Sequence, residues 1–369
     1  MSTVVCPRPA GFIRGPIVNM LRSRLGRTLT YPHGPDRFIE LFDRTAVADE
    51  TVGMVTRVTH PTPRSVRLAV RPNARWQGFR AGQYVELAVE IDGRRERRMF
   101  SPAQSQHAGD ELEFTMAVQP DGRLTRHIKN NARAGDRVIL GAAAGTFHLP
   151  DARPQRLVLI SAGSGITPVL SMLRTLIDER HAGRIDFIHY ARSPDEELYA
   201  EALDTLSTAL PGLHIHRFHT RGGGAHFTGA QLDALVPDHA QAETFVCGPQ
   251  PLLEATRAHF GMRGIGERLH QEAFGPAAAD PPGNAANGDI RFAHSAQSVA
   301  NDGRTLLEQA EAAGLSPTHG CRMGVCYACT CRKTSGRVRD LRTGEVGPDG
   351  DAEIQICVSV PAGPVALDL

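Results

Sequence analysis

The stretch Cys321-Arg-Met-Gly-Val-Cys326-Tyr-Ala-Cys329, followed by Cys357, decides the fold of this 369-residue chain. The spacing C-x4-C-x2-C…C is the one with which four thiolates hold a [2Fe–2S] cluster. Gly320 and Gly324 let the backbone of the loop come close to such a cluster, because glycine has no Cβ. Apolar residues alternate over 354–360, which predicts a strand that carries Cys357 on its other face.

Zinc is the main alternative for these cysteines. Structural zinc usually takes two C-x2-C pairs, and this sequence has one. Five of the seven cysteines fall in the last fifty residues, and the odd total argues against a disulfide framework. We therefore expect Cys321, Cys326, Cys329 and Cys357 to be cluster ligands, and Cys331 to be a small buried side chain.

Composition and charge exclude several classes of protein. The formal net charge of +1 gives no basic field for nucleic acid. There is no run of about 18 apolar residues that would span a membrane. The N-terminus also lacks the apolar segment of a signal peptide. We expect a cytoplasmic protein, acting as a monomer, with no nucleic-acid partner and no membrane span.

The pattern of apolar and turn-forming residues along the chain predicts five segments. Residues 1–50 form an N-terminal arm, in which 12–27 can make a helix with an arginine face; it packs on its own protein or docks on a membrane or partner. Short strands over 54–60, 65–70, 83–91, 112–118 and 136–141 predict an antiparallel barrel over 51–152.

The middle and the end of the chain differ from the barrel. Strands over 157–160, 185–191, 213–219 and 244–248, with helices between them, predict a parallel α/β domain over 153–275. Residues 276–288 have the composition of a linker. In the last domain, over 289–369, Thr305 and Glu308 form a capping box at the start of a helix that Gly314 ends.

A glycine-rich turn follows the first parallel strand. Gly163-Ser-Gly165-Ile-Thr167-Pro168 leads into a helix, with Thr167 expected as the N-cap and Pro168 as the first helical residue. Backbone amides there can meet a pyrophosphate at the positive end of the helix. The turn lacks the third glycine of G-x-G-x-x-G, so it is not the usual dinucleotide fingerprint.

Several motifs together resemble a known family. The segments 302–315 and 320–326 and the final strand resemble a plant-type ferredoxin domain of β-grasp fold. Arg98-Met99-Phe100-Ser101 resembles the R-x-Y-S motif of the ferredoxin–NADP reductase superfamily, with Phe100 in place of the usual tyrosine. The turn at 163–168 resembles its nucleotide loop, and 247–249 its C-G-P turn. The order implied is a flavin-binding barrel, a nucleotide-binding domain and a ferredoxin domain.

This resemblance implies FAD, NADPH and the cluster as cofactors, with NADH still open. Arg98 would meet the flavin pyrophosphate, Phe100 would cover the isoalloxazine, and Ser101 would bond near N5. The other flavin residues implied are Gly122, Leu124, Thr125 and Phe274. The nucleotide residues implied are Gly163, Gly165, Thr167, Pro168, Arg192, Ser193, Cys247, Gly248 and Pro249, with Ser101 and Cys247 as catalytic residues.

Plainer interpretations stay open for four of these residues. Thr125 can be a helix N-cap, Phe274 a core residue, Cys247 a buried thiol and Arg192 a solvated loop side chain. Arg192 and Ser193 are the residues that favour NADPH, because they can hold a 2′-phosphate.

The resemblance implies a reductase that takes a hydride from NAD(P)H and passes electrons singly through the cluster to a partner. The segments 320–326, 335–346 and 357–369 resemble the bacterial electron-transfer partners of membrane stearoyl-CoA desaturases. We therefore expect a fatty-acyl desaturase or hydroxylase as acceptor, with peripheral membrane contact through it. The alternatives are a reductase component of a Rieske ring-hydroxylating oxygenase or P450, a reductase of small acceptors, or a non-catalytic redox sensor.

Overall fold

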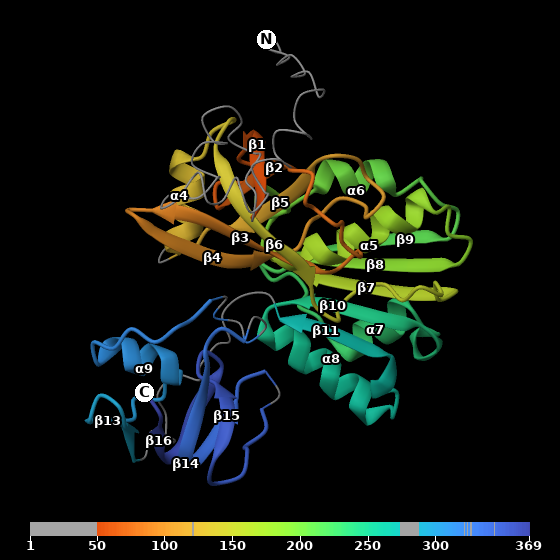
Figure 1. Cartoon of the computed structure of the whole chain (residues 1–369). Helices are drawn as coiled ribbons and strands as arrows, with labels where there is room; N and C mark the ends of the chain where they lie inside the picture. The colour runs from red at the N-terminus through yellow and green to blue at the C-terminus, as the bar shows by residue number, and fades with distance from the viewer. Residues whose placement is uncertain are drawn as a thin grey trace.

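Three sheets in chain order build the protein, as the computed structural model in Figure 1 shows. The structure describes residues 50–119, 122–273, 288–320, 322, 324, 327–342 and 344–369. Nearly all of the predicted arm and linker, over 1–49 and 276–287, lies outside these residues. Among the described helices, none is both long enough and apolar enough to cross a bilayer.

The first domain is the predicted antiparallel barrel. Its strands are β1 (Thr51–Thr59), β2 (Ser65–Pro72), β3 (Tyr84–Ile91), β4 (Arg94–Phe100), β5 (Leu112–Ala117) and β6 (Arg137–Ala144). They lie in the order β4-β3-β6-β1-β2-β5, and the two edge strands contact each other, so the sheet curls on itself. The helix α4 (Arg123–Asn131) contacts β2, β3 and β4, and its Leu124 and Ile128 enter the barrel core.

The second domain is a parallel sheet with helices on both faces, as predicted. Its strands β7 (Arg156–Ala162), β8 (Arg184–Ala191), β9 (Leu213–His219), β10 (Glu243–Gly248) and β11 (Leu269–Ala273) lie in the order β11-β10-β7-β8-β9. The helices are α5 (Ile166–Asp178), α6 (Ala200–Leu206), α7 (Gly229–Leu235) and α8 (Gln250–Met262). Figure 1 shows α5 and α6 on one face and α7 and α8 on the other.

Strand periodicity explains this layering. Successive side chains of a strand point to opposite faces of the sheet. In β7, Leu157 and Leu159 belong to the core beneath α5, whereas Val158 and Ile160 belong to the core beneath α7 and α8. Both faces are covered, which is why the strand reads as a continuous apolar run.

The third domain is the predicted ferredoxin-like sheet. It consists of β12 (Asp289–Phe292), β13 (Gln297–Ala300), α9 (Leu306–Ala312), β14 (Thr330–Asp340), β15 (Ala352–Gln355) and β16 (Ser359–Leu367), with strand order β13-β12-β16-β14-β15. The capping box is confirmed: the Glu308 N–H donates to Thr305 Oγ1 (3.3 Å), and the Thr305 N–H donates to Glu308 Oε2 (3.1 Å). Gly314 takes a φ of 83° just beyond the helix.

The predicted strand around Cys357 is wrong. Residues 356–358 form a turn between β15 and β16, and all three side chains are buried. The reason is topological, because β14 lies between β15 and β16 in the sheet. The chain must therefore leave one side of β14 and cross to the other, which a continuous strand cannot do. The side chains of residues 355–360 are all buried, so the apolar alternation in the sequence does not mark two faces of a strand here.

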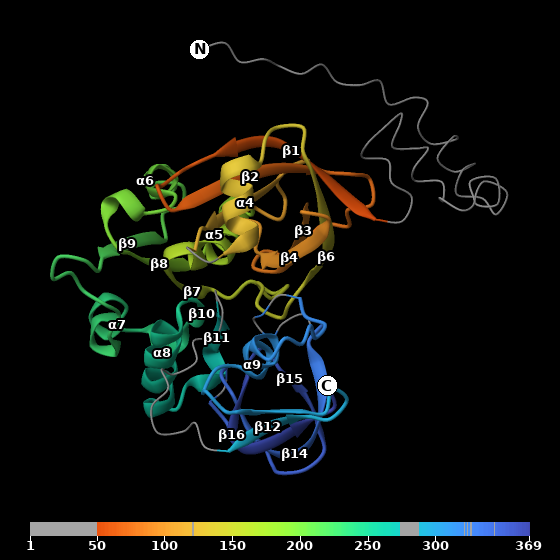
Figure 2. The ribbon, with the colours of Figure 1, turned by 90° about the vertical axis from the view of Figure 1, so that its left-hand side faces the viewer.

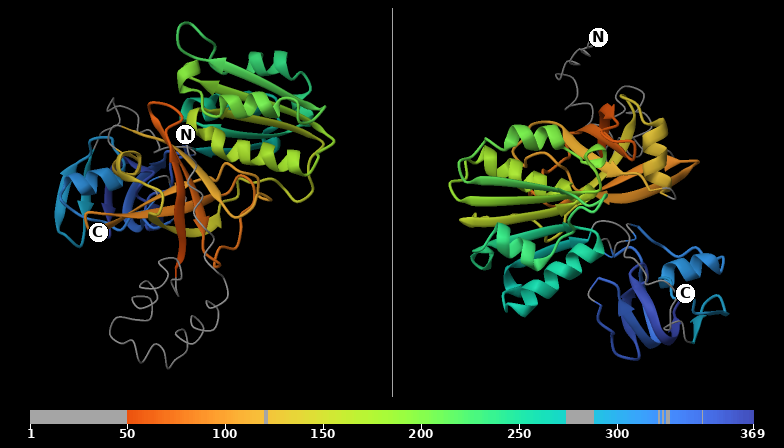
Figure 3. Two further views of the ribbon diagram at one scale, coloured as in Figure 1. Left: turned by 90° about the horizontal axis from the view of Figure 1, so that it is seen from above. Right: turned by 180° about the vertical axis from the view of Figure 1, so that it is seen from behind.

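The third domain lies beside the second at α8. Figures 2 and 3 show it below the barrel and next to the α8 face of the parallel sheet. Arg257 of α8 donates from Nη2 to the carbonyl oxygen of Arg342 at 3.4 Å, which joins the two domains directly.

Candidate functional site

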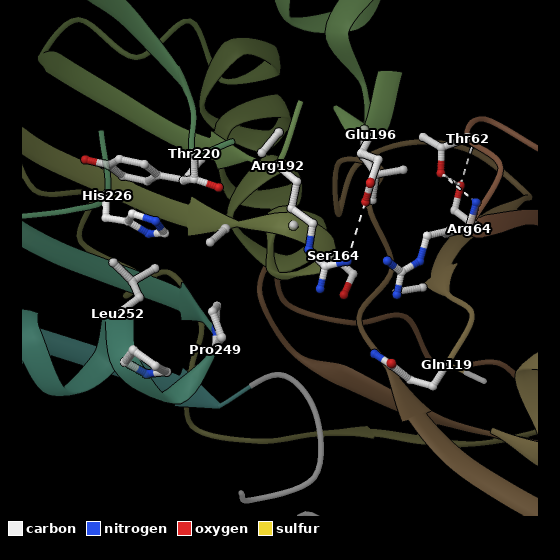
Figure 4. A pocket seen from close by; sticks show the side chains of 18 of the residues that line it. Thr62, Arg64, Gln119, Ser164, Arg192, Glu196, Thr220, His226, Pro249 and Leu252 are labelled. Carbon is white, nitrogen blue, oxygen red and sulfur yellow. Dashed lines mark hydrogen bonds and ion pairs between the residues drawn. The ribbon is translucent and has the colours of Figure 1, made fainter. Parts of the chain in front are cut away.

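A cavity of about 490 Å³ lies between the barrel and the carboxyl ends of the parallel strands (Figure 4). The barrel lines it with Thr62, Arg64, Ser65, Ala117, Val118 and Gln119. The second domain lines it with residues that follow β7, β8 and β10, among them Gly163, Arg192 and Pro249. Ligands of parallel α/β sheets bind at this end of the strands. The cavity thus brings together three of the predicted nucleotide residues.

The glycine-rich turn packs directly on β10. A Cβ on Gly165 would lie 2.4 Å from the carbonyl oxygen of Cys247, so only glycine fits there. Gly163 has a φ of +55° and open space beside it, next to the cavity. This turn is the place where a bound pyrophosphate can approach backbone amides at the positive end of α5.

The predicted start of α5 is wrong by two residues. The N-cap is Gly165, and the buried Thr167 and Pro168 are the second and third residues of the helix. The Thr167 hydroxyl donates to the carbonyl oxygen of Ser164 (3.3 Å) instead of accepting a capping N–H. Pro168 is still tolerated, because N–H groups in the first helical turn have no partner within the helix.

Arg192 lies in the cavity wall just after β8, and its side chain is 53% exposed. Its Nη1 is 3.6 Å from Glu196 Oε2, and Glu196 is also paired with Arg221 at 2.8 Å. Two arginines therefore neutralise the carboxylate that faces this end of the cavity (Figure 4). Ser193 comes directly before the turn 194–196 and is not among the lining residues.

Cys247 is completely buried at the end of β10. Burial raises the pKa of its thiol well above the usual value, so the thiol stays neutral. Gly248 follows, where a Cβ would meet Leu252 at 2.9 Å, and Pro249 is the N-cap of α8 in the cavity wall. Phe274 lies outside the described residues.

Glu272 was not predicted as a site residue, although it lies opposite Cys247 in the β10–β11 pair. Burial raises the pKa of its carboxyl to about 8. Its Oε2 is enclosed and has no hydrogen-bond partner in the described part of the chain. The raised pKa lowers the tendency of this carboxyl to carry a negative charge beside Cys247. Its sequence neighbours give no sign of this, since the contact spans two strands.

The residues proposed for the flavin lie on the barrel. Ser101 is 1% exposed, and its hydroxyl has no partner among the described residues. A buried hydroxyl without a partner is rare, and a flavin edge would satisfy it. Phe100 packs within the apolar core of the barrel, and Arg98, half-buried on β4, donates to the carbonyl oxygen of Arg97 (2.6 Å). None of the three lines the cavity.

The helix α4 offers its start to a phosphate. Gly122 is its N-cap, without a side-chain cap, and its first turn has no acidic residue. Thr125 is the third helical residue, with Oγ1 at 3.5 Å from the carbonyl oxygen of Gly122, so its interpretation as an N-cap is wrong. Leu124 is buried in the barrel core. A helix start whose N-cap has no side chain and the Ser101 hydroxyl, which has no partner among the described residues, fit a flavin with a phosphate group.

The cluster loop is described in part. Cys329 and Cys357 are buried at 2% and 4% exposure in the core of the third domain, and Cys321 and Cys326 lie outside the described residues. Cys331 is buried, as predicted. Gly324 has a φ of +72°, and a Cβ there would lie 2.8 Å from Val358. The loop therefore needs glycine beside Cys357, and its donor set of soft thiolates fits a [2Fe–2S] cluster.

Arg342 holds this loop in place, and no motif pointed to it. Its Nη1 donates to the carbonyl oxygen of Gly324 (2.5 Å), and its Nη2 donates to Asp340 Oδ2 (2.6 Å). Tyr327, between two of the cysteines, has a φ of 57° and is 68% exposed. The backbone of the loop is thus held at Gly324 by Arg342, and the Tyr327 ring is exposed on the surface of the same loop.

Comparisons with known proteins agree with these three domains. Residues 51–149 match the family profile for an oxidoreductase FAD-binding domain, 159–258 that for an oxidoreductase NAD-binding domain, and 292–362 that for a 2Fe-2S iron-sulfur cluster binding domain. An "NADPH oxidoreductase" of Mycobacterium tuberculosis is 33% identical over 98% of this chain and 96% of its own length.

Other relatives are parts of oxygenase systems. The "Glycine betaine monooxygenase reductase subunit" of Pseudomonas aeruginosa is 29% identical over 79% of this chain and 87% of its own length. The solved structure of a phthalate dioxygenase reductase has the same fold, with a TM-score of 0.62 and 23% identity, over 87% of this chain and 98% of that one. The chain belongs to the ferredoxin–NADP reductase family, as an oxidoreductase with FAD-binding, NAD-binding and C-terminal [2Fe–2S] domains.

Proposed function

We propose that this reductase passes electrons from NADPH to a terminal oxygenase. One chain holds a nucleotide cavity beside a flavin-binding barrel and, in a separate domain, the cysteines of a one-electron centre. A bound flavin supplies the conversion of a hydride into single electrons. That combination supports delivery to a protein that takes one electron at a time.

The chain's own residues bind and orient the reactants. The turn around Gly165 would receive the pyrophosphate of the nucleotide, and Arg192 its 2′-phosphate. The Ser101 hydroxyl would bond the flavin edge. Glu272 lies opposite Cys247 at this strand end, and burial raises the pKa of its carboxyl, which would favour a neutral surface beside a bound nicotinamide.

An oxygenase is the acceptor that the relatives favour, in place of the desaturase expected from the sequence. Two of them carry the names of monooxygenase reductase components, from Pseudomonas aeruginosa and, at 30% identity, from Mycolicibacterium smegmatis. A desaturase stays the second candidate for one reason. The relative that covers 98% of the chain, arm included, has a name that specifies no acceptor.

Reconstitution distinguishes the two acceptors. The purified protein, loaded with FAD and cluster, is mixed with NADPH and either a Rieske-type monooxygenase or a membrane-embedded diiron desaturase. We expect product from the oxygenase in proportion to the NADPH consumed, and a monomeric reductase by light scattering. Product from the desaturase alone would replace the oxygenase by the second candidate and leave the reductase chemistry intact.

A further inference from the structure

Three side chains converge between α7 and α8, away from the cavity. Asp233 comes from α7, His239 from the turn 239–241, and His259 from α8. The two imidazoles are 1% and 7% exposed. Asp233 Oδ1 is 3.2 Å from His259 Nε2 and 3.6 Å from His239 Nε2, and the two Nε2 atoms are 3.3 Å apart.

The chemistry of these atoms is that of a metal site. His239 Nδ1 lies 2.9 Å from the carbonyl oxygen of Val236, which can only accept, so in the neutral imidazole the proton is on Nδ1 and Nε2 has a lone pair. Asp233 Oδ1 is enclosed and receives no hydrogen bond in the described part of the chain. Two atoms with lone pairs therefore face His259 Nε2, between two buried imidazoles and an Asp233 side chain that is 34% exposed.

The spacing of the three atoms fits a tetrahedral ion. Nitrogen and oxygen ligands lie about 2.0–2.1 Å from zinc, which places neighbouring ligand atoms about 3.3–3.4 Å apart. The separations of 3.2, 3.3 and 3.6 Å match this edge length.

The surroundings hold the three ligands in this arrangement. A backbone hydrogen bond fixes the His239 ring, and Arg263 Nη2 binds the other carboxylate oxygen of Asp233 at 2.6 Å. Such outer contacts orient metal ligands. The third ligand, His259, packs against Gly229, the first residue of α7. A Cβ at position 229 would lie only 2.1 Å from His259 Nδ1.

We propose that Asp233, His239 and His259 form a binding site for Zn²⁺ or a similar divalent transition metal, with a fourth position open to water. Two imidazoles and a carboxylate are ligands that these ions take. The ion would tie α7 to α8. The N-cap of α8, Pro249, lies in the cavity wall, and Arg257 of α8 contacts the third domain. A metal bound to α8 would therefore make the link between the cavity and the third domain more rigid. The proposal does not depend on which acceptor the reductase serves.

Metal content tests the site directly. The full-length protein, loaded with FAD and cluster, is dialysed against Zn²⁺, and zinc is measured beside iron. We expect one zinc per chain that is not removed by a gel-filtration step. Zinc X-ray absorption should show nitrogen and oxygen ligands at about 2.0–2.1 Å and no sulfur at about 2.3 Å. Sulfur in that shell would place the zinc on cysteines of the cluster loop and overturn the proposal.

Variants assign the ligands. Loss of an outer partner costs about 10–100-fold in metal affinity, so His239→Gln with His259→Gln should lower zinc affinity at least about 100-fold. Asp233→Asn is a milder second variant that keeps the size of the side chain. His294→Gln is the matched control, because His294 pairs with Asp368 at 3.1 Å on the exposed surface. If a variant has the same flavin and cluster absorbance as the wild type, it has folded correctly. Zinc bound equally by wild type and the double variant, or not bound by wild type, would refute the site.

Discussion

At the scale of single residues, Arg192 tests how the protein selects its nucleotide. Its guanidinium is half exposed in the cavity wall, and Glu196, its acidic neighbour, is shared with Arg221. A lost bond to a charged group is worth roughly 1.5–3 kcal/mol, so Arg192→Ala should raise the KM for NADPH about tenfold to a hundredfold and leave NADH nearly unchanged. Steady-state reduction of ferricyanide with each nucleotide measures both values.

The matched control is Arg217→Ala. Arg217 is an arginine of the same domain that pairs with Asp204 at 2.7 Å and does not line the cavity. It should leave both KM values unchanged. Equal effects of Arg192→Ala on the two nucleotides would show that this side chain does not read the 2′-phosphate.

Residues were predictable where the chemistry lies in a short motif. The spacing of the four cysteines predicts the cluster ligands, which stays a prediction, whereas the close backbone approach expected at the glycine-rich turn is seen at Gly165. Glu272 and Arg342 were not predictable, because each acts across two elements that the sequence does not place together. The convergence of Asp233 with two histidines has the same cause. Thr167 and Thr125 were misplaced because a hydroxyl near a helix start can either cap it or donate backward.

At the scale of elements, apolar alternation predicted most strands of the first two domains, including the edge strands β5 and β9, and missed β4 and β11. The sequence indicates β4 only through the motif at its end, since most of its residues are charged and exposed. Residues 269–273 gave no strand signal, because β11 is half-buried throughout. Both strands lie at a sheet edge, where one side meets solvent or another domain. Their sequences, RRERRMF and LHQEA, contain too few apolar residues to show an alternating pattern.

The end of α5 carries a prediction about pH. Two side chains bind the carboxylate of Glu179. Arg153 Nη2, from the segment that joins the first two domains, lies 2.7 Å from Oε1, and His107 Nε2, from the barrel domain, lies 2.8 Å from it. The Arg153 hydrogen bond, with help from His107, lowers the pKa of Glu179 from 4.5 to about 2. A carboxyl whose pKa is lower in the folded state stabilises above its unfolded pKa, and the contribution is lost as pH falls toward the folded value.

Glu179→Gln should therefore lower the free energy of unfolding by roughly 1.5–3 kcal/mol at pH 7. The difference from wild type should shrink between pH 4.5 and pH 2, as the carboxyl takes up its proton. Urea unfolding across this range measures it. Glu201→Gln, at an exposed position of α6, should change stability by less than about 0.5 kcal/mol. A difference that stays constant with pH would mean that the effect is not electrostatic.

At the scale of the whole molecule, the three domains divide the reaction between them. The nucleotide cavity is shared by the first two domains, whereas the cysteines belong to the third. A long hydrogen bond joins α8 to Arg342 of the third domain, the residue that also pins the cluster loop. If electrons enter at the cavity and leave through the third domain, as we propose, the two steps should be separable by mutation.

Cys326→Ser and Arg98→Ala should separate them in opposite directions. Serine is a poorer ligand for iron than thiolate, so Cys326→Ser should lose the cluster but keep the flavin. Ferricyanide, which can take electrons directly from flavin, should still be reduced by NADPH, whereas delivery to the oxygenase should collapse. Arg98→Ala should lose the flavin and keep the cluster, with neither acceptor reduced. Absorbance spectra report which centre each variant holds. Normal delivery to the oxygenase by a Cys326→Ser protein without its cluster would show that electrons leave the molecule from the flavin, and that the third domain is not their exit.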